Sequence, residues 1–137
     1  MTADGFTRIR RGAAALFVAG AALCATGCGA SQLFEAVPAG LDRAAVPTIA
    51  LDMTAHRYAF VPDTLRVPAG TLVKLRVTST GGTHGFALAA FGIDERLEEG
   101  VPKEIELYAP RAGVYPFKCS HLCGIGHFGM DGVLIVQ

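Results

Sequence analysis

The chain has 137 residues, which is enough for one folded domain and too few for two. Lysine plus arginine and aspartate plus glutamate are both 12, so the formal net charge is zero and no basic surplus points to nucleic acid. The 17 glycines and 7 prolines, in a chain that is 51% hydrophobic, favour a β-rich fold with many turns.

Residues 1–27 have the pattern of an export signal. Three arginines between residues 8 and 11 precede an uncharged stretch that ends only at Glu35, and this order is typical of secretory signals. The stretch Ala25-Thr26-Gly27-Cys28 is similar to a bacterial lipobox, which predicts cleavage before Cys28 and lipidation of its sulfur. The alternative is an uncleaved membrane anchor, because residues 12–34 are long enough to span a bilayer. Both alternatives predict a domain anchored at the periplasmic face of a bacterial cell envelope.

Residues 28–47 are expected to form a tether, because Pro38, Gly40 and Pro47 interrupt a stretch of mixed charge. The folded domain is expected at residues 48–137. Within it, short segments alternate apolar and polar residues with the period of two that is typical of strands. The predicted strands cover residues 48–53, 56–60, 65–67, 71–78, 84–89, 104–108, 114–118 and 132–136. The charged residues at 94–99 are expected to form a solvated turn. About seven strands with regular turns predict an antiparallel β-sandwich.

The chemically active residues are concentrated in CSHLCGIGHFGM, residues 119–130. A disulfide between Cys119 and Cys123 is one interpretation, since exported thiols tend to oxidise, but it leaves His127 and Met130 unexplained. Zinc is a second interpretation, although methionine is not a preferred zinc ligand. Thiolate, thioether and imidazole ligands in one loop favour copper.

A mononuclear copper site uses one cysteine, two histidines and a weak axial methionine. Three of these ligands follow one another in the loop: Cys123, His127 and Met130. His84, which starts a predicted strand, is the best candidate for the second histidine. Cys119 is then left over, which makes sense if two thiolates bridge two metal ions. The methionine would be one axial ligand and the backbone carbonyl of His121 the other.

The run C-S-x-L-C-G-x-x-H-x-x-M resembles the binuclear copper A site of cytochrome c oxidase subunit II, in particular the short subunit II of the bacterial ba3-type oxidases. The similarity continues through residues 67–71, 77–79, 84–86 and 132–136. It implies an all-β, cupredoxin-like, antiparallel or mixed Greek-key β-sandwich at 48–137 that holds two copper ions. By match to the motif, the implied ligands are Cys119 and Cys123 as bridges, His84 and His127 as terminal ligands, Met130 as an axial ligand and His121 through its carbonyl oxygen.

The resemblance also implies a function. Such a domain passes single electrons from a donor such as cytochrome c toward subunit I of a haem-copper terminal oxidase, and makes or breaks no substrate bond by itself. This chain departs from most family members at His121, where they have glutamate. It also has no tryptophan to form the family's usual aromatic entry patch for electrons, so Phe86 and Phe128 are expected to form the apolar docking surface instead. One alternative is a periplasmic lipoprotein that delivers or senses copper, which the lipidated Cys28 and the additional His121 motivate. Another is a structural domain with a disulfide and no metal.

Overall fold

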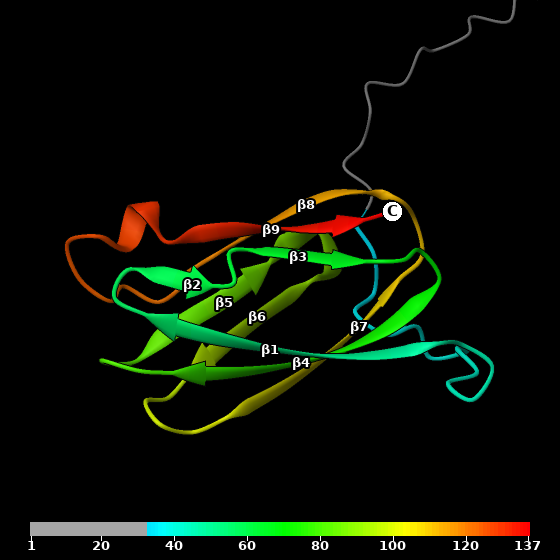
Figure 1. Ribbon diagram of the computed structural model, residues 1–137, viewed down its shortest axis with the longest axis horizontal. Helices are drawn as coiled ribbons and strands as arrows, with labels where there is room; N and C mark the ends of the chain where they lie inside the picture. Colours follow the sequence, from blue (N-terminus) through cyan, green and yellow to red (C-terminus); the bar gives the residue numbers. More distant parts are fainter. Residues whose placement is uncertain (1–32) are drawn as a thin grey trace, which may run out of the picture.

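In the computed structural model, which describes residues 33–137, nine strands form two β-sheets (Figure 1). The first sheet contains, in spatial order, β2 (Ala59–Val61), β1 (Thr48–His56), β4 (Thr71–Ser79) and β7 (Lys103–Ala109). The second contains β3 (Thr64–Val67), β9 (Asp131–Val136), β8 (Gly113–Lys118), β5 (His84–Leu88) and β6 (Ile93–Leu97). The pairs β1–β4 and β3–β9 are parallel and the others are antiparallel. The predicted all-β, mixed β-sandwich is therefore confirmed.

Only short helical turns accompany these strands within residues 33–137. They are the 3-10 helices η1 (Ala89–Phe91) and η2 (His127–Gly129). Neither is long or apolar enough to cross a membrane, and among the described residues no other helix is present. The predicted signal or anchor at 1–27 and the lipidation site Cys28 lie outside the described residues.

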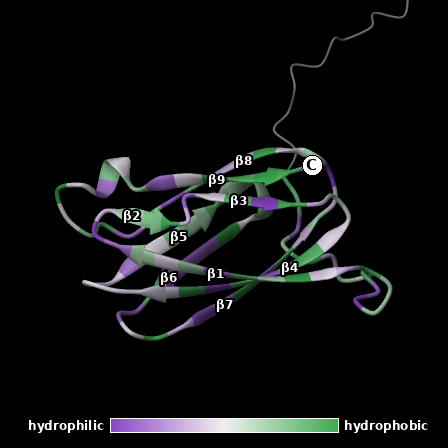
Figure 2. Ribbon diagram, viewed as in Figure 1, coloured by the Kyte–Doolittle hydropathy of each residue, from purple (hydrophilic) through white to green (hydrophobic). Residues whose placement is uncertain are grey.

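Strand β4 shows why the alternating segments form a sandwich. Val73, Leu75 and Val77 point into the core, whereas Lys74 and Arg76 between them face solvent. The two basic residues lie opposite acidic residues of β7 and form ion pairs with them, Lys74 with Glu106 and Arg76 with Glu104. One face of the sheet is thus apolar and the other charged, as a half-buried strand requires. Figure 2 shows the same alternation of hydrophobic and hydrophilic residues along the strands.

Three phenylalanines fill the core between the sheets. Phe60 of β2, Phe86 of β5 and Phe117 of β8 have ring centroids 5.2–5.9 Å apart, and each is about 1% exposed. Burying each ring stabilises the fold by about 1.5–3 kcal/mol. Phe86 follows His84 by two residues and Phe117 precedes Cys119 by two, so this aromatic cluster supports both segments that carry predicted ligands. The expectation that Phe86 lies on a docking surface is wrong, because in a strand it points to the same inward face as His84.

The described part of the segment expected as a tether packs against the sandwich. The backbone N–H of Phe34 donates to Ala90 at 2.7 Å, and Ala36 accepts from Tyr108 at 2.6 Å. The Phe34 ring lies 5.3 Å from that of Phe91 and 5.9 Å from that of Tyr115. Residues 33–47 therefore cover the end of the domain away from the loop that joins β8 to β9 (Figure 1).

Residues 94–97 of the charged run expected as a solvated turn instead belong to the edge strand β6 (Ile93–Leu97), whereas Glu98 lies in the turn that follows, where its carbonyl oxygen accepts from the Val101 N–H. The strand pairs antiparallel with β5 over residues 93–97, and its apolar ends Ile93 and Leu97 are buried. Asp94 and Arg96 face solvent between them. The prediction was wrong because three consecutive charged residues hide the period of two, although charged side chains are common on edge strands that must avoid pairing with other chains.

Candidate metal centre

The loop from Cys119 to Met130 joins β8 to β9 at one end of the sandwich, where it appears in orange and red (Figure 1). The Cys119 backbone N–H donates to the Met130 carbonyl oxygen at 2.9 Å, which closes the base of the loop. Inside the loop, η2 places His127 and Phe128 on a short turn. From the neighbouring strand, His84 begins β5 beside the base of the loop.

Three predicted ligands meet at one point. The Sγ atoms of Cys119 and Cys123 and a ring nitrogen of His84 all lie within 4.8 Å of one another. The two sulfurs are 3.7 Å apart, against about 2.05 Å in a disulfide. Both cysteines are free thiols, so the structure holds a pair of donor sulfurs and no covalent bridge between them.

His84 is buried in the site without hydrogen-bond partners for its ring. Its side chain is 0% exposed, and neither ring nitrogen has a hydrogen-bond partner. Burying an unpaired polar group of this kind costs about 1–3 kcal/mol. Burial also lowers the pKa of His84 below its ordinary value, which keeps the imidazole neutral and able to donate a lone pair. A buried, unpartnered, neutral imidazole beside two thiols fits a soft metal ion.

The other predicted ligands surround Cys123 and Cys119. Cys123 Sγ lies 3.8 Å from His127 Nδ1 and 3.9 Å from Met130 Sδ. The His121 carbonyl oxygen lies 3.1 Å from Cys119 Sγ. The structure therefore places all six predicted ligand atoms at the same end of the sandwich. His127 is not part of the group in which every ligand atom lies within 4.8 Å of every other.

The thiol of Cys123 favours its protonated form in the absence of metal. Burial, followed by the hydrogen bond and charge of the neighbouring Cys119, raises the pKa of Cys123 above its ordinary value. Thiolate is the form that binds metal, so metal uptake would release protons from this pair. The Gly85 backbone N–H, 3.4 Å from Cys119 Sγ, is placed to stabilise the thiolate once it forms.

Two close packings hold the loop against the strands, and neither was predicted. A Cβ on Gly85 would lie 2.3 Å from Ser120 Oγ and 2.6 Å from the His121 nitrogen, so only glycine fits there. The Tyr58 ring packs equally closely on the backbone of Gly124 and Gly126. The sequence signal was present in the glycines that follow His84 and Cys123, but it gives no contact partner.

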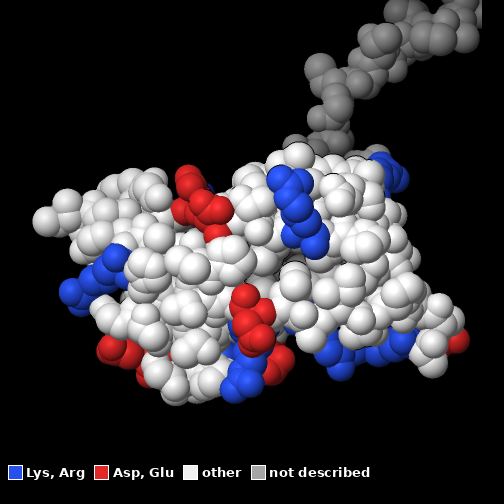
Figure 3. Space-filling model, in the orientation of Figure 1, with Lys and Arg blue, Asp and Glu red and all other residues white. Residues whose placement is uncertain are grey.

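The outer surface of the loop is apolar and uncharged. Residues 119–130 include no lysine, arginine, aspartate or glutamate, and the projecting end is white in Figure 3. The exposed hydrophobic side chains at this end are Tyr58, Leu122, Ile125 and Phe128. Ile125 is 99% exposed and Phe128 is 90% exposed. A pocket of about 230 Å³ beside them is lined by Lys118, Cys119, His127, Phe128, Met130 and Asp131.

Fold and donor set together define a cupredoxin-like domain, a β-sandwich whose C-terminal loop carries soft metal donors. Over residues 31–136 the chain matches the family model for the "Cytochrome C oxidase subunit II, periplasmic domain". The chain therefore belongs to the family of periplasmic domains of cytochrome c oxidase subunit II, which confirms the resemblance seen in the sequence.

Individual relatives agree with this assignment. Cytochrome c oxidase subunit 2 of Pneumocystis carinii is 32% identical over 93 residues, which cover 68% of this chain and 38% of the relative. Its counterpart in Thermus thermophilus is 28% identical over 83 residues, which cover 61% of this chain and 62% of the relative. The chain thus spans less than two thirds of the length of these relatives. A chain in a solved heme-copper terminal oxidase dimer has the same fold, with a TM-score of 0.63, 22% identity, and coverage of 82% of this chain and 78% of that one.

Proposed function

We propose that this domain holds a binuclear copper centre and passes single electrons from a periplasmic donor such as cytochrome c toward a haem-copper terminal oxidase. The observation that carries the proposal is the meeting of His84 with two free thiols, Cys119 and Cys123, within 4.8 Å. Two adjacent thiols are one more than a mononuclear copper site uses. Membership of the subunit II family supports the same class of partner.

The chain offers a full set of ligands for two copper ions. Two copper ions held there would supply one-electron redox chemistry. Cys119 and Cys123 would bridge the ions, and His84 and His127 would each hold one of them. The weak axial ligands would be the Met130 thioether and the carbonyl oxygen of His121.

The protein's own contribution is to hold these ligands in place and to shield most of them from solvent. His84, Cys119 and Met130 are at most 3% exposed. The aromatic cluster packs against β5 and β8 from the core of the sandwich, and the backbone hydrogen bond between Cys119 and Met130 fixes both ends of the loop. Ligands held by a close-packed interior move little when the charge of the centre changes, which keeps the barrier to electron transfer low.

The apolar end of the loop is the proposed docking surface for the electron donor. Phe128 follows the proposed ligand His127 directly, and the two rings are 5.3 Å apart with an edge-to-face angle of 72°. A donor that covers Phe128 and Ile125 would therefore come within a few ångströms of a ligand and exclude water from the contact. The acceptor would be subunit I of the oxidase, and the anchor would be either the lipid on Cys28 or an N-terminal helix.

Burial of the ligands opposes the alternative of copper delivery. An acceptor protein that extracts copper must reach the ligands with its own donor atoms, but the three most buried ligands are closed to solvent. Cys123 and His127 are only partly exposed. We therefore expect tight retention, with rapid transfer to an apo acceptor as the result that would favour delivery.

Copper titration of the reduced chain tests the proposal directly. We expect two copper ions per chain and an electron spin resonance spectrum in which one unpaired electron is shared by two copper nuclei. Cys119→Ser removes one bridge and should give a spectrum from a single nucleus. Uptake of one ion or none by the folded wild-type chain would refute the proposal.

A further inference from the structure

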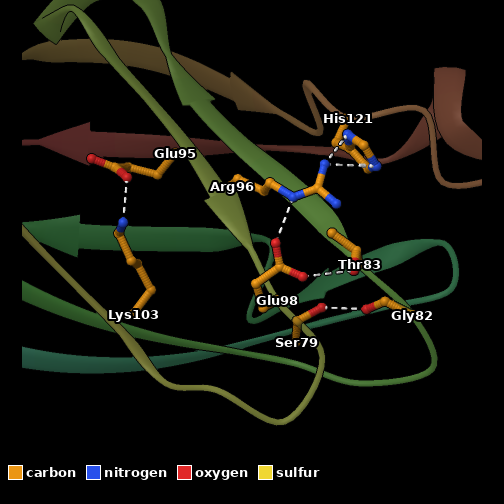
Figure 4. A network of polar contacts seen from close by, with 8 residues as sticks. All are labelled: Ser79, Gly82, Thr83, Glu95, Arg96, Glu98, Lys103 and His121. Atoms are coloured by element: carbon orange, nitrogen blue, oxygen red, sulfur yellow. Dashed lines mark hydrogen bonds and ion pairs between the residues drawn. The ribbon is translucent and has the colours of Figure 1, made fainter.

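Two side chains of the edge strand β6 reach across β5 to the metal-binding loop. Asp94 Oδ1 accepts a hydrogen bond from Ser120 Oγ at 2.6 Å. Arg96 Nη1 lies 3.1 Å from Nδ1 and 3.3 Å from Nε2 of the His121 ring (Figure 4). Two alternate residues of one strand thus hold two consecutive residues of the loop, immediately after Cys119.

The register of the sheet makes this contact possible. Arg96 pairs with Gly85 and Asp94 pairs with Ala87 across the β5–β6 ladder. Both partners on β5 are small, and Gly85 has no side chain at all. The backbone of Ser120 can therefore lie directly on β5 within reach of the longer β6 side chains.

Arg96 also connects the loop to the segment that carries His84. Its Nε lies 2.5 Å from Glu98 Oε1, and Glu98 Oε2 accepts a hydrogen bond from Thr83 Oγ1 at 3.2 Å (Figure 4). The hydrogen bond from Arg96 lowers the pKa of Glu98, which stays a carboxylate. Thr83 is the residue before His84, so one guanidinium joins two segments that each carry a proposed ligand.

We infer that Asp94 and Arg96 are positioning residues that clamp the loop and orient the His121 carbonyl toward the Cys119 sulfur. The ligand role of that carbonyl rests on the proposed function. These contacts are solvent-exposed, with Arg96 and Glu98 side chains 56% and 55% exposed, so they contribute little to the overall free energy of folding. Their effect is local: they decide where the loop sits above Cys119. The fixed positive charge of Arg96 also favours the reduced, less positive form of a bound copper centre and raises its reduction potential.

A matched set of variants separates this role from general surface electrostatics. Arg96→Gln and Asp94→Ala break the two clamp contacts, and Arg96→Lys keeps the charge but loses the planar fork. Lys103→Gln is the control. It also removes one cation, from an exposed ion pair with Glu95. Glu95 lies between Asp94 and Arg96 on β6, but its side chain points toward Lys103 and away from the loop (Figure 4).

The first measurement needs no metal. Cys119 is 3% exposed, whereas Cys123 is partly exposed, so the rate at which a thiol reagent modifies Cys119 in the reduced apo protein, followed at that residue by tandem mass spectrometry, reports how often the loop opens. We expect modification to be about 10-fold faster in Arg96→Gln and Asp94→Ala than in wild type, the lower end of the 10–100-fold effects that outer-shell partners have on metal sites. Lys103→Gln should react at the wild-type rate, and thermal unfolding should be alike in all variants.

The second measurement uses the copper-loaded chain. Arg96→Gln should lose copper to a chelator about 10-fold faster, show an altered spin resonance spectrum and have a lower reduction potential, with Arg96→Lys between it and wild type. If Arg96→Gln and Asp94→Ala match Lys103→Gln in thiol protection, the clamp is refuted. If the wild-type chain takes up fewer than two copper ions, the proposed function fails, and the thiol rates alone still decide whether the clamp exists.

Discussion

His84 and His127 are the same residue type in opposite surroundings. His84 begins a strand, is fully buried and has no hydrogen-bond partner. His127 lies on a short turn of the loop, is partly exposed and packs its ring against the exposed Phe128. One half of the candidate centre is therefore built by the core of the sandwich, and the other half by a surface loop.

The difference separates two tasks. In the inner half, the imidazole of the candidate ligand His84 is buried without hydrogen-bond partners, which destabilises the fold. Natural proteins keep such destabilising groups mainly at functional sites. The outer half carries no such cost and instead offers apolar surface to a partner. Changes in the inner half should therefore alter both metal binding and the stability of the metal-free protein. Changes in the outer half should leave that stability nearly unchanged and act on metal binding at His127 or on the rate of electron entry at Phe128.

The largest effect is expected from replacing the two histidines by leucine. His84→Leu should weaken copper binding by more than about 100-fold, since even outer-shell changes cost 10–100-fold. It should also raise the free energy of unfolding of the metal-free protein by about 1 kcal/mol, because an unpaired buried polar group is removed. His127→Leu should weaken copper binding but change that free energy by less than about 0.5 kcal/mol. Copper titration and denaturant unfolding of both apo variants test the contrast, and a destabilised His84→Leu apo protein would contradict it.

Gly85→Ala should disturb the contact between the inner and outer halves. The added methyl would overlap Ser120 and the His121 backbone, and overpacking of this kind costs about 1–3 kcal/mol. Chemical unfolding should show this loss together with weaker copper retention. Gly40→Ala is the control, because a Cβ there meets nothing within 4 Å, and it should change stability by less than about 0.5 kcal/mol. Equal stability of the two variants would show that the loop can move away from β5 at no cost.

The same division explains which features the sequence could predict. Strand β4 was predicted to within one residue because Val73, Leu75 and Val77 alternate with polar residues along one half-buried strand. The candidate ligands of the loop could be named because their chemistry is local and their spacing is short. The approach of His84 to the loop depends on strand order. The sequence made His84 a candidate because it starts a predicted strand, and the family resemblance supported that choice.

Other features depend on contacts between distant residues. Nothing near Arg96 in the sequence indicates that it lies beside His121, because the contact exists only through the pairing of β6 with β5. Phe34 likewise packs on residues far along the chain. The burial of Phe86, in contrast, was available from the sequence, since alternation in a strand places it on the same face as His84.

Phe128→Ser should slow electron entry while leaving the inner half intact. Loss of an exposed aromatic anchor at the centre of a docking surface costs about 1 kcal/mol or more, which corresponds to at least about a fivefold lower second-order rate with a cytochrome c donor. Stopped-flow reduction of the copper-loaded chain measures this rate. Val114→Ser is the control, since Val114 is also exposed but lies at the other end of β8 from the loop. Equal rates for both variants would move the docking surface elsewhere.

The smallest effect is expected from salt. Residues 119–130 carry no lysine, arginine, aspartate or glutamate, and the charges that flank the loop have both signs: Lys118 and Asp131 line the pocket beside Phe128, and Arg96 pairs with Glu98 (Figure 3). Opposite charges so close together largely cancel in their effect on an approaching donor. Charges separated by more than about 8–10 Å are largely screened at physiological ionic strength. The second-order rate of reduction should therefore change by less than about twofold between low and physiological salt. A steep fall with added salt, of the kind seen in electrostatically steered pairs, would place the donor on a charged face instead of on Phe128 and Ile125.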